Sequence, residues 1–120
     1  MVQYVWSEFV DSILGVGESL EIFGVRNWAL DQDRALDAVE KLSRQGVAVA
    51  GGDVYRWENG RLEPTYDNWY CNKNDGEHMD AYVERSISLA RNYITVYPNS
   101  DGGALFSMVP VARCGPARIS

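Results

Sequence analysis

The sequence is poor in the residues from which most catalytic and metal centres are built. Its 120 residues include one histidine, His78, and two cysteines, Cys71 and Cys114. A metal site needs three or four convergent ligands, and the two cysteines lack the paired spacing of such a site. Acidic, thiol and imidazole side chains do gather between residues 67 and 78, but an acidic loop produces mixed spacing of this kind by chance. We therefore expect neither a metal ion nor another cofactor.

Long apolar runs are absent too, and none approaches the length that spans a bilayer. The opening segment, MVQYVWSEFVDSIL, lacks a basic stretch and carries Glu8 and Asp11 inside its apolar pattern, so we expect no secretory signal. Two thiols without a disulfide framework are usual in a reduced chain. The alternative is a single disulfide between Cys71 and Cys114. These absences predict a cytoplasmic protein without a membrane partner.

Basic side chains are outnumbered by acidic ones. Lysine and arginine number 11 against 17 aspartates and glutamates, which gives a formal net charge of −6. Binding to nucleic acid needs cationic side chains that displace counterions from the phosphates, so we expect no nucleic-acid partner. The acidic balance favours a basic partner, because complementary fields speed the encounter. The alternative is that the charge only keeps a small protein soluble.

Three segments have the apolar spacing of amphipathic helices. They cover residues 6–14, 31–46 and about 77–96. Asp31 is the expected N-cap of the second helix, which a glycine in the left-handed conformation ends, and Asp75 is the expected N-cap of the third. The third helix has a wide apolar face, which is typical of a helix packed on a sheet.

Asn59–Gly60 is a strong hairpin signal, because a type I′ turn needs a positive φ at both central positions. A two-residue loop there fixes the pairs Glu58–Arg61, Trp57–Leu62, Arg56–Glu63, Tyr55–Pro64, Val54–Thr65 and Asp53–Tyr66. Pro64 donates no ladder hydrogen bond, so the second strand is expected to end there or to lie at the sheet edge. Asp53 would fall on the apolar face, where a carboxylate needs a hydrogen-bond donor unless a bulge at Gly51–Gly52 turns it outward. We expect Asp53 and Tyr66 to form a structural clamp.

The pattern as a whole predicts an α+β fold. A small antiparallel sheet, made of a hairpin at about residues 47–66 and a C-terminal strand at about 104–112, is packed by about three helices. The run SLEIFGV, residues 19–25, is a further candidate strand. Residues 1–112 are predicted to form a single domain, and residues 113–120 a loose C-terminal tail.

Catalytic constellations are weakly indicated. Cys71 and His78 have no third group marked to orient them, and the histidine, not the cysteine, would stand at the start of a helix. Glu58 and Glu63 could form a carboxylate pair, but each has a cross-strand arginine in the predicted register, and an ion-paired carboxylate is a poor general acid. We expect no enzyme. The alternative is a small hydrolase that uses Cys71 and His78 or carboxylates.

The stretch TYDNWYCNKNDGE, residues 65–77, has the composition of a turn-rich loop. Its three aromatic residues, Tyr66, Trp69 and Tyr70, follow no clean period. Tyrosine and tryptophan beside acidic and amide side chains are typical of interface anchors. The alternatives are a loop held down by its own aromatics, or a small-ligand or carbohydrate module that stacks its ligand on Trp69 and Tyr66.

Four segments resemble a known family. In chain order they are IFGVRNWALDQDRALDAVEKL, GVAVAGGDVY, PTYDNWYC and AYVERSISLARNYI, of which GGDVY and TYDNWYC are the most specific parts. They resemble bacterial immunity proteins of polymorphic toxin systems, and the Immunity protein 40 family in particular, over about residues 20–110. The resemblance implies a cytosolic antidote without a catalytic role, which binds a cognate toxin domain and blocks its active site or a required motion.

These observations together predict a protein that works by binding a partner. The predicted contact residues are Glu58, Glu63, Asp67, Trp69, Tyr70 and Glu77. The acidic side chains would steer the partner and accept hydrogen bonds, and Trp69 would be the anchor that becomes buried in the interface.

Overall fold

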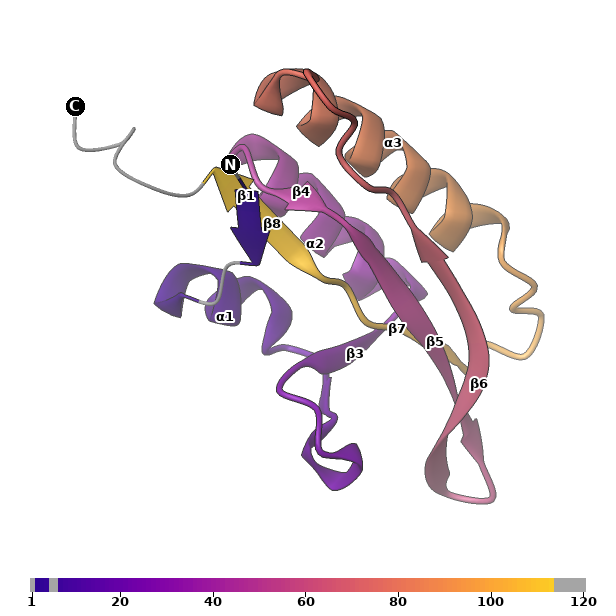
Figure 1. Ribbon diagram of the computed structural model, residues 1–120. Helices are drawn as coiled ribbons and strands as arrows, with labels where there is room; N and C mark the ends of the chain where they lie inside the picture. Colours follow the sequence, from indigo (N-terminus) through magenta and orange to yellow (C-terminus); the bar gives the residue numbers. More distant parts are fainter. Residues whose placement is uncertain (1, 5–6, 114–120) are drawn as a thin grey trace.

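The computed structural model describes residues 2–4 and 7–113, and the side chains of residues 7–111 (Figure 1). In chain order the elements are β1 (Val2–Tyr4), α1 (Glu8–Leu14), β2 (Glu18–Ser19), the 3-10 helix η1 (Glu21–Phe23), β3 (Trp28–Asp31), α2 (Gln32–Arg44), β4 (Ala48–Val49), β5 (Gly51–Glu58), β6 (Arg61–Tyr70), α3 (Met79–Val96), β7 (Ala104–Phe106) and β8 (Pro110–Arg113). The predicted α+β class with three helices is confirmed. Arg113, the first residue of the predicted tail 113–120, belongs to β8, and the rest of that tail and Trp6 of the first predicted helix lie outside the described residues.

The strands form a five-stranded sheet in the order β2-β3-β7-β5-β6 and a three-stranded sheet in the order β1-β8-β4, with antiparallel pairing throughout. Val109 joins the two sheets. Its N–H donates to the Gly51 carbonyl at 2.9 Å, and its carbonyl accepts from the Ala50 N–H at 2.9 Å. The ladder therefore continues from one sheet into the other, and the strands bend where it does so.

The predicted strand over residues 104–112 is wrong as one continuous strand, because residues 107–109 interrupt it. Asn27, which is 7% exposed, donates its side-chain amide to the Met108 carbonyl at 2.7 Å. The Ser107 hydroxyl accepts from the Asp53 N–H at 3.1 Å. These side-chain hydrogen bonds replace part of the regular ladder. β7 thus belongs to the larger sheet and β8 to the smaller one.

The helices pack on one side of the sheet and share one apolar core with it (Figure 1). The Asp31 carboxylate accepts from the Arg34 N–H at 2.9 Å, which confirms the predicted N-cap of α2, and Gly46 has the left-handed φ of +70° that ends this helix. α3 is tied to β4 by the buried Ser86 hydroxyl, which accepts from the Val49 N–H at 3.0 Å. No helix in the described part of the chain is long and apolar enough to cross a membrane.

Two local predictions are wrong. α3 begins at Met79 with His78 at its N-cap position, not with Asp75. The reason is that the preceding loop closes on itself, because the Glu77 side chain accepts from the Asn74 N–H at 2.9 Å. The candidate strand at residues 19–25 is mostly the turn η1, whose φ of +74° at Gly24 reverses the chain. The sequence pattern did not predict β3, an inner strand of the larger sheet.

The hairpin turn at residues 59–60 is as predicted, with φ of +52° and +78°. The four pairs nearest the turn, from Glu58–Arg61 to Tyr55–Pro64, are confirmed, and β6 lies at the sheet edge. Beyond them the prediction is wrong, because a β-bulge at residues 65–67 shifts the register and pairs Asp53 with Asn68. Thr65 stabilises this bulge: its hydroxyl donates to the Val54 carbonyl at 2.9 Å and accepts from the Asp67 N–H at 3.1 Å.

Candidate partner-binding surface

One face of the five-stranded sheet is covered by helices, and the other is open over much of β5 and β6. Val54 and Trp69 belong to the core beneath the helices, whereas Tyr55 belongs to a separate cluster of four buried residues on the opposite side. Side chains alternate along a strand, so every second residue of β5 shares the side of Tyr55. We call the side of β5 and β6 that faces away from α2 and α3 the outer face. It carries Asp53, Trp57, Asn68 and Tyr70.

The bulge and the end of β6 present two tyrosines to solvent. Tyr66 is 85% exposed and has a φ of +71°, which is unusual for a residue other than glycine. Tyr70 is 73% exposed. Strained backbone conformations persist where the surrounding structure enforces them, and they are frequent at functional sites. The chain therefore exposes two large amphipathic side chains on the edge strand β6.

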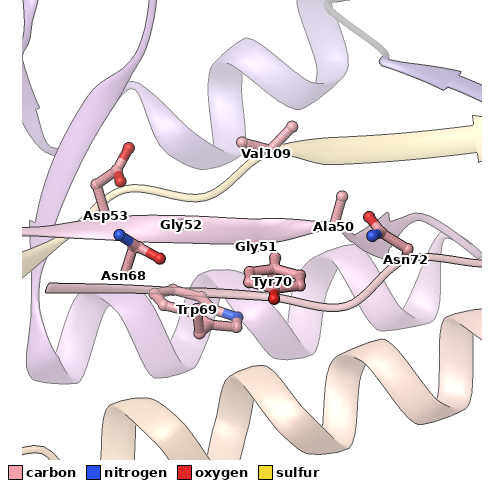
Figure 2. A pocket seen from close by; sticks show the side chains of 9 residues that line it. All are labelled: Ala50, Gly51, Gly52, Asp53, Asn68, Trp69, Tyr70, Asn72 and Val109. Carbon is pink, nitrogen blue, oxygen red and sulfur yellow. The ribbon is translucent and has the colours of Figure 1, made fainter.

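A hollow of about 240 Å³ lies at the end of β5 and β6 that is distant from the hairpin turn (Figure 2). It is lined by Ala50, Gly51, Gly52, Asp53, Asn68, Trp69, Tyr70, Asn72 and Val109. The two glycines are required by close approach of the backbone. A Cβ on Gly52 would lie 1.9 Å from the Ser107 carbonyl oxygen, and one on Gly51, whose φ is +154°, would lie 2.3 Å from the Trp69 carbonyl oxygen.

Asp53 is the charged residue of this hollow, and it is exposed. Its carboxylate forms no hydrogen bond or ion pair with the residues that the structure describes. The predicted clamp with Tyr66 is therefore wrong, because the bulge moves Tyr66 out of register and Asp53 pairs with Asn68. The Asp53 charge does act on a neighbour, because the pKa of Tyr55 is raised, first by burial of its hydroxyl and then by this carboxylate.

Trp69 lies in the core and not on the surface as predicted. It is 6% exposed, and its ring stacks on that of Tyr93 with 4.7 Å between the centroids. Its indole N–H is buried and has no hydrogen-bond partner among the described residues. The strand conformation of residues 65–70, which had been expected to form a loop, turns this side chain toward α3. Trp69 is thus a packing residue.

The acidic residues predicted for contact are separated by the fold. Arg56 does not neutralise Glu63 across the hairpin as expected, because its guanidinium donates to both carboxylate oxygens of Asp101, at 2.8 and 2.9 Å. Glu63 has a distant pairing with Arg61 at 3.9 Å, and Glu58 stays exposed near the turn. Both carboxylates are therefore more available to a partner than the predicted register implied.

Two other predicted contact residues are held by bonds within the fold. Asp67 accepts from the Tyr97 hydroxyl at 2.5 Å, which ties the bulge to the end of α3. The Glu77 carboxylate accepts from Arg85 at 2.7 and 2.9 Å. The Arg85 guanidinium, together with the Asn74 N–H, lowers the pKa of Glu77 to about 2. Glu77 thus fixes the loop before α3.

The alternative of a cysteine–histidine pair receives no support from the geometry. Cys71 is 4% exposed, and its sulfur lies 3.1 Å from the Arg85 guanidinium, which also donates to the Asn72 carbonyl at 2.7 Å. His78 is exposed at the start of α3. Within the described part of the chain, no group of three or more histidine, cysteine or acidic residues could hold a metal ion.

A second hollow, of about 460 Å³, lies on the helical side. It is lined by Ser43, Asp80, Val83, Glu84, Ile87, Ser88 and Arg91. Arg91 is already bonded to Glu40 of α2, at 2.7 Å. This hollow therefore contains a fixed cation beside its acids, whereas the hollow on β5 and β6 has an unpaired acid.

Comparison with protein-family models matches residues 19–110 to Immunity protein 40. The chain belongs to this family. The match covers α2, α3 and the five-stranded sheet except for Glu18 of β2. It confirms the resemblance carried by the four sequence segments, and it identifies the chain as an immunity protein. Comparisons with curated proteins and with solved structures found no match.

Proposed function

We propose that this immunity protein acts in the cytoplasm, where it binds a cognate toxin domain and blocks it without catalysing a reaction. Family membership supports a toxin as the partner. The observation that carries the proposal further is the pair of exposed tyrosines, Tyr66 and Tyr70, held on the bulged edge strand β6 beside an unpaired acid. Tyrosine is enriched at interfaces because it offers large contact area and a hydroxyl at little cost in conformational entropy.

We assign different roles to the residues of this surface. Tyr66 and Tyr70 are the anchors, in place of Trp69, because an anchor has to be accessible before the complex forms. Asp53 accepts hydrogen bonds from the toxin. Glu58 and Glu63 lie toward the hairpin turn and steer a basic toxin domain during approach, since exposed rim charges act mainly on the association rate.

A growth-rescue experiment tests the proposal. The chain is co-expressed with a candidate toxin domain taken from a neighbouring reading frame, and growth and the dissociation constant are measured. The wild type restores growth, and the double variant Tyr66→Ser/Tyr70→Ser does not, although its circular dichroism and thermal unfolding remain those of a folded protein. Phe9→Ser, which also removes an exposed aromatic ring but from α1, is the matched control and rescues fully.

The experiment tests the toxin-neutralising function and the binding surface separately. Failure of the wild type to bind or rescue contradicts the toxin-neutralising function. Full rescue by the double tyrosine variant shows that the toxin is bound by another surface.

A further inference from the structure

The hollow on β5 and β6 combines an acid, two amides and an aromatic ring around a floor of bare backbone. In Figure 2, Asp53 and Asn68 stand at one end, Tyr70 lies near the middle and Asn72 stands at the other end. Gly51 and Gly52 supply no side chain that could fill the space. Each of these groups can act on a cation: the carboxylate by charge, the amides through their carbonyl oxygens, and the ring through its π face.

We propose that this hollow receives one arginine side chain of the toxin domain. The inference rests on the function proposed above and specifies the chemistry of that partner. The guanidinium donates to the Asp53 carboxylate and to the amide oxygen of Asn68 or Asn72, while its plane stacks on Tyr70. Arginine suits this arrangement better than lysine, because a planar group with five donors can bond a carboxylate through two nitrogens and stack at the same time.

The size of the hollow favours a single side chain over a free small molecule. At about 240 Å³ it lies below the range of roughly 300–1,000 Å³ that encloses a drug-sized ligand. Most of its lining residues lie on the adjacent strands β5 and β6, and four of them, Asp53, Asn68, Tyr70 and Asn72, are exposed, so a partner docked on this surface can reach the space. A side chain that projects from a partner can enter it, whereas a free ligand would remain largely in water.

The charge of the hollow also favours a cationic group from outside the described chain. Asp53 is its one acid, and the other lining residues are neutral. Arg85, which bonds the Asn72 carbonyl at 2.7 Å, is itself held by Glu77. The Asp53 carboxylate has no cation of its own among the described residues, and the net charge of −6 attracts a basic surface.

The first arm of the test measures toxin binding by titration calorimetry with the full chain. Asp53→Asn keeps the shape of the side chain but removes the charge, and we expect its dissociation constant to rise at least about tenfold. Tyr70→Leu keeps an apolar side chain but removes the π face, and we expect a rise of about two- to fivefold. Glu84→Gln removes one charge at the hollow on the helical side and leaves the affinity within about twofold.

The second arm does not need the toxin. The ¹⁵N-labelled chain is titrated with N-acetyl-arginine amide, with the neutral isostere N-acetyl-citrulline amide, and with N-acetyl-lysine amide. We expect the arginine compound alone to shift the amide signals of Gly51, Gly52 and Asp53, and Asp53→Asn to abolish the shifts. Equal shifts from the lysine compound would overturn the choice of arginine, and equal shifts from citrulline would overturn recognition of a cation.

The two arms keep the two proposals apart. If the wild type neutralises the toxin and Asp53→Asn binds it equally well, the arginine site is wrong and the proposed function stands. If the wild type does not bind the toxin, the proposed function is wrong, and the amide titration alone then decides the chemistry of the hollow. Absence of arginine-specific shifts at residues 51–53 in that titration would overturn the site.

Discussion

At the residue scale, Trp69 stabilises the fold by filling the space between β6 and α3. Its ring is 6% exposed and stacks on Tyr93. We expect Trp69→Ala to lower the free energy of unfolding by about 3–5 kcal/mol, because it leaves a cavity that the sheet and helix cannot close. Trp69→Phe should cost less, since the indole N–H has no described partner to lose. Denaturant titration measures both, and an unchanged midpoint for Trp69→Ala would contradict the packing role.

Tyr66 differs from Trp69, because its side chain is exposed and its backbone has a strained, positive φ. Asparagine tolerates a positive φ better than tyrosine does. We expect Tyr66→Asn to leave the free energy of unfolding unchanged or to raise it by up to about 1 kcal/mol, while the affinity for the toxin falls. Thermal unfolding and calorimetry test the two parts. A loss of stability would show that the ring supports the bulge.

Glu77 gives the fold a pH dependence with a definite sign. Its pKa is lowered from 4.5 to about 2 in the folded chain, first by the Arg85 guanidinium and then by the Asn74 N–H. Because the folded pKa is the lower one, this contribution is complete above pH 4.5 and is lost as the pH falls toward 2.

The variant Glu77→Gln isolates this contribution. It should be less stable than the wild type at neutral pH, and the difference should shrink as the pH falls from about 4.5 to about 2. Unfolding by urea across this range measures the difference. A gap that stays constant with pH would contradict the assignment.

At the element scale, the path of β5 depends on a close approach to its neighbours. A Cβ on Gly52 would lie 1.9 Å from the Ser107 carbonyl oxygen and 2.5 Å from the Trp69 ring. We expect Gly52→Ala to lower the free energy of unfolding by at least about 2 kcal/mol, because backbone as well as a side chain would have to move.

Gly103 offers a matched control for this substitution. A Cβ there would meet its nearest neighbour at 3.5 Å, which is ordinary contact. Gly103→Ala should therefore change the stability by much less than Gly52→Ala in the same denaturant titration. Similar losses in the two variants would refute the close-approach explanation.

Several elements could be predicted because their signals are local. The Asp31 cap bonds an N–H three residues away, and the hairpin turn needs only the φ preferences of Asn59 and Gly60. The contact residues were harder to predict. The same stretch of β6 carries the exposed Tyr70 and the buried Trp69, and composition alone cannot tell which of the two is available to a partner. The alternation of a strand would have separated these two adjacent residues, but the polar residues on either side of them indicate a loop.

At the scale of the whole molecule, the net charge of −6 should act on association with the toxin. Added salt shortens the Debye length from about 10 Å at 0.1 M to about 3 Å at 1 M and so screens long-range attraction. We expect the association rate constant to fall at least about tenfold between low salt and about 1 M salt, while the dissociation rate changes less. Stopped-flow mixing measures both. A rate that does not depend on salt would indicate that the charge serves solubility only.

The sequence by itself determined the two ends of α2, the turn, the four hairpin pairs next to it and the edge position of Pro64, because each depends on neighbours a few residues away. The tertiary structure decided the rest. Arg56 bonds Asp101, 45 positions further on, and Trp69 turns to Tyr93. The Ser107 hydroxyl accepts from the N–H of Asp53 in β5, 54 positions away, and β7 ends at the preceding residue. Such choices among distant partners follow from how the layers pack, because a local pattern fixes what a side chain can bond but not which group comes within reach.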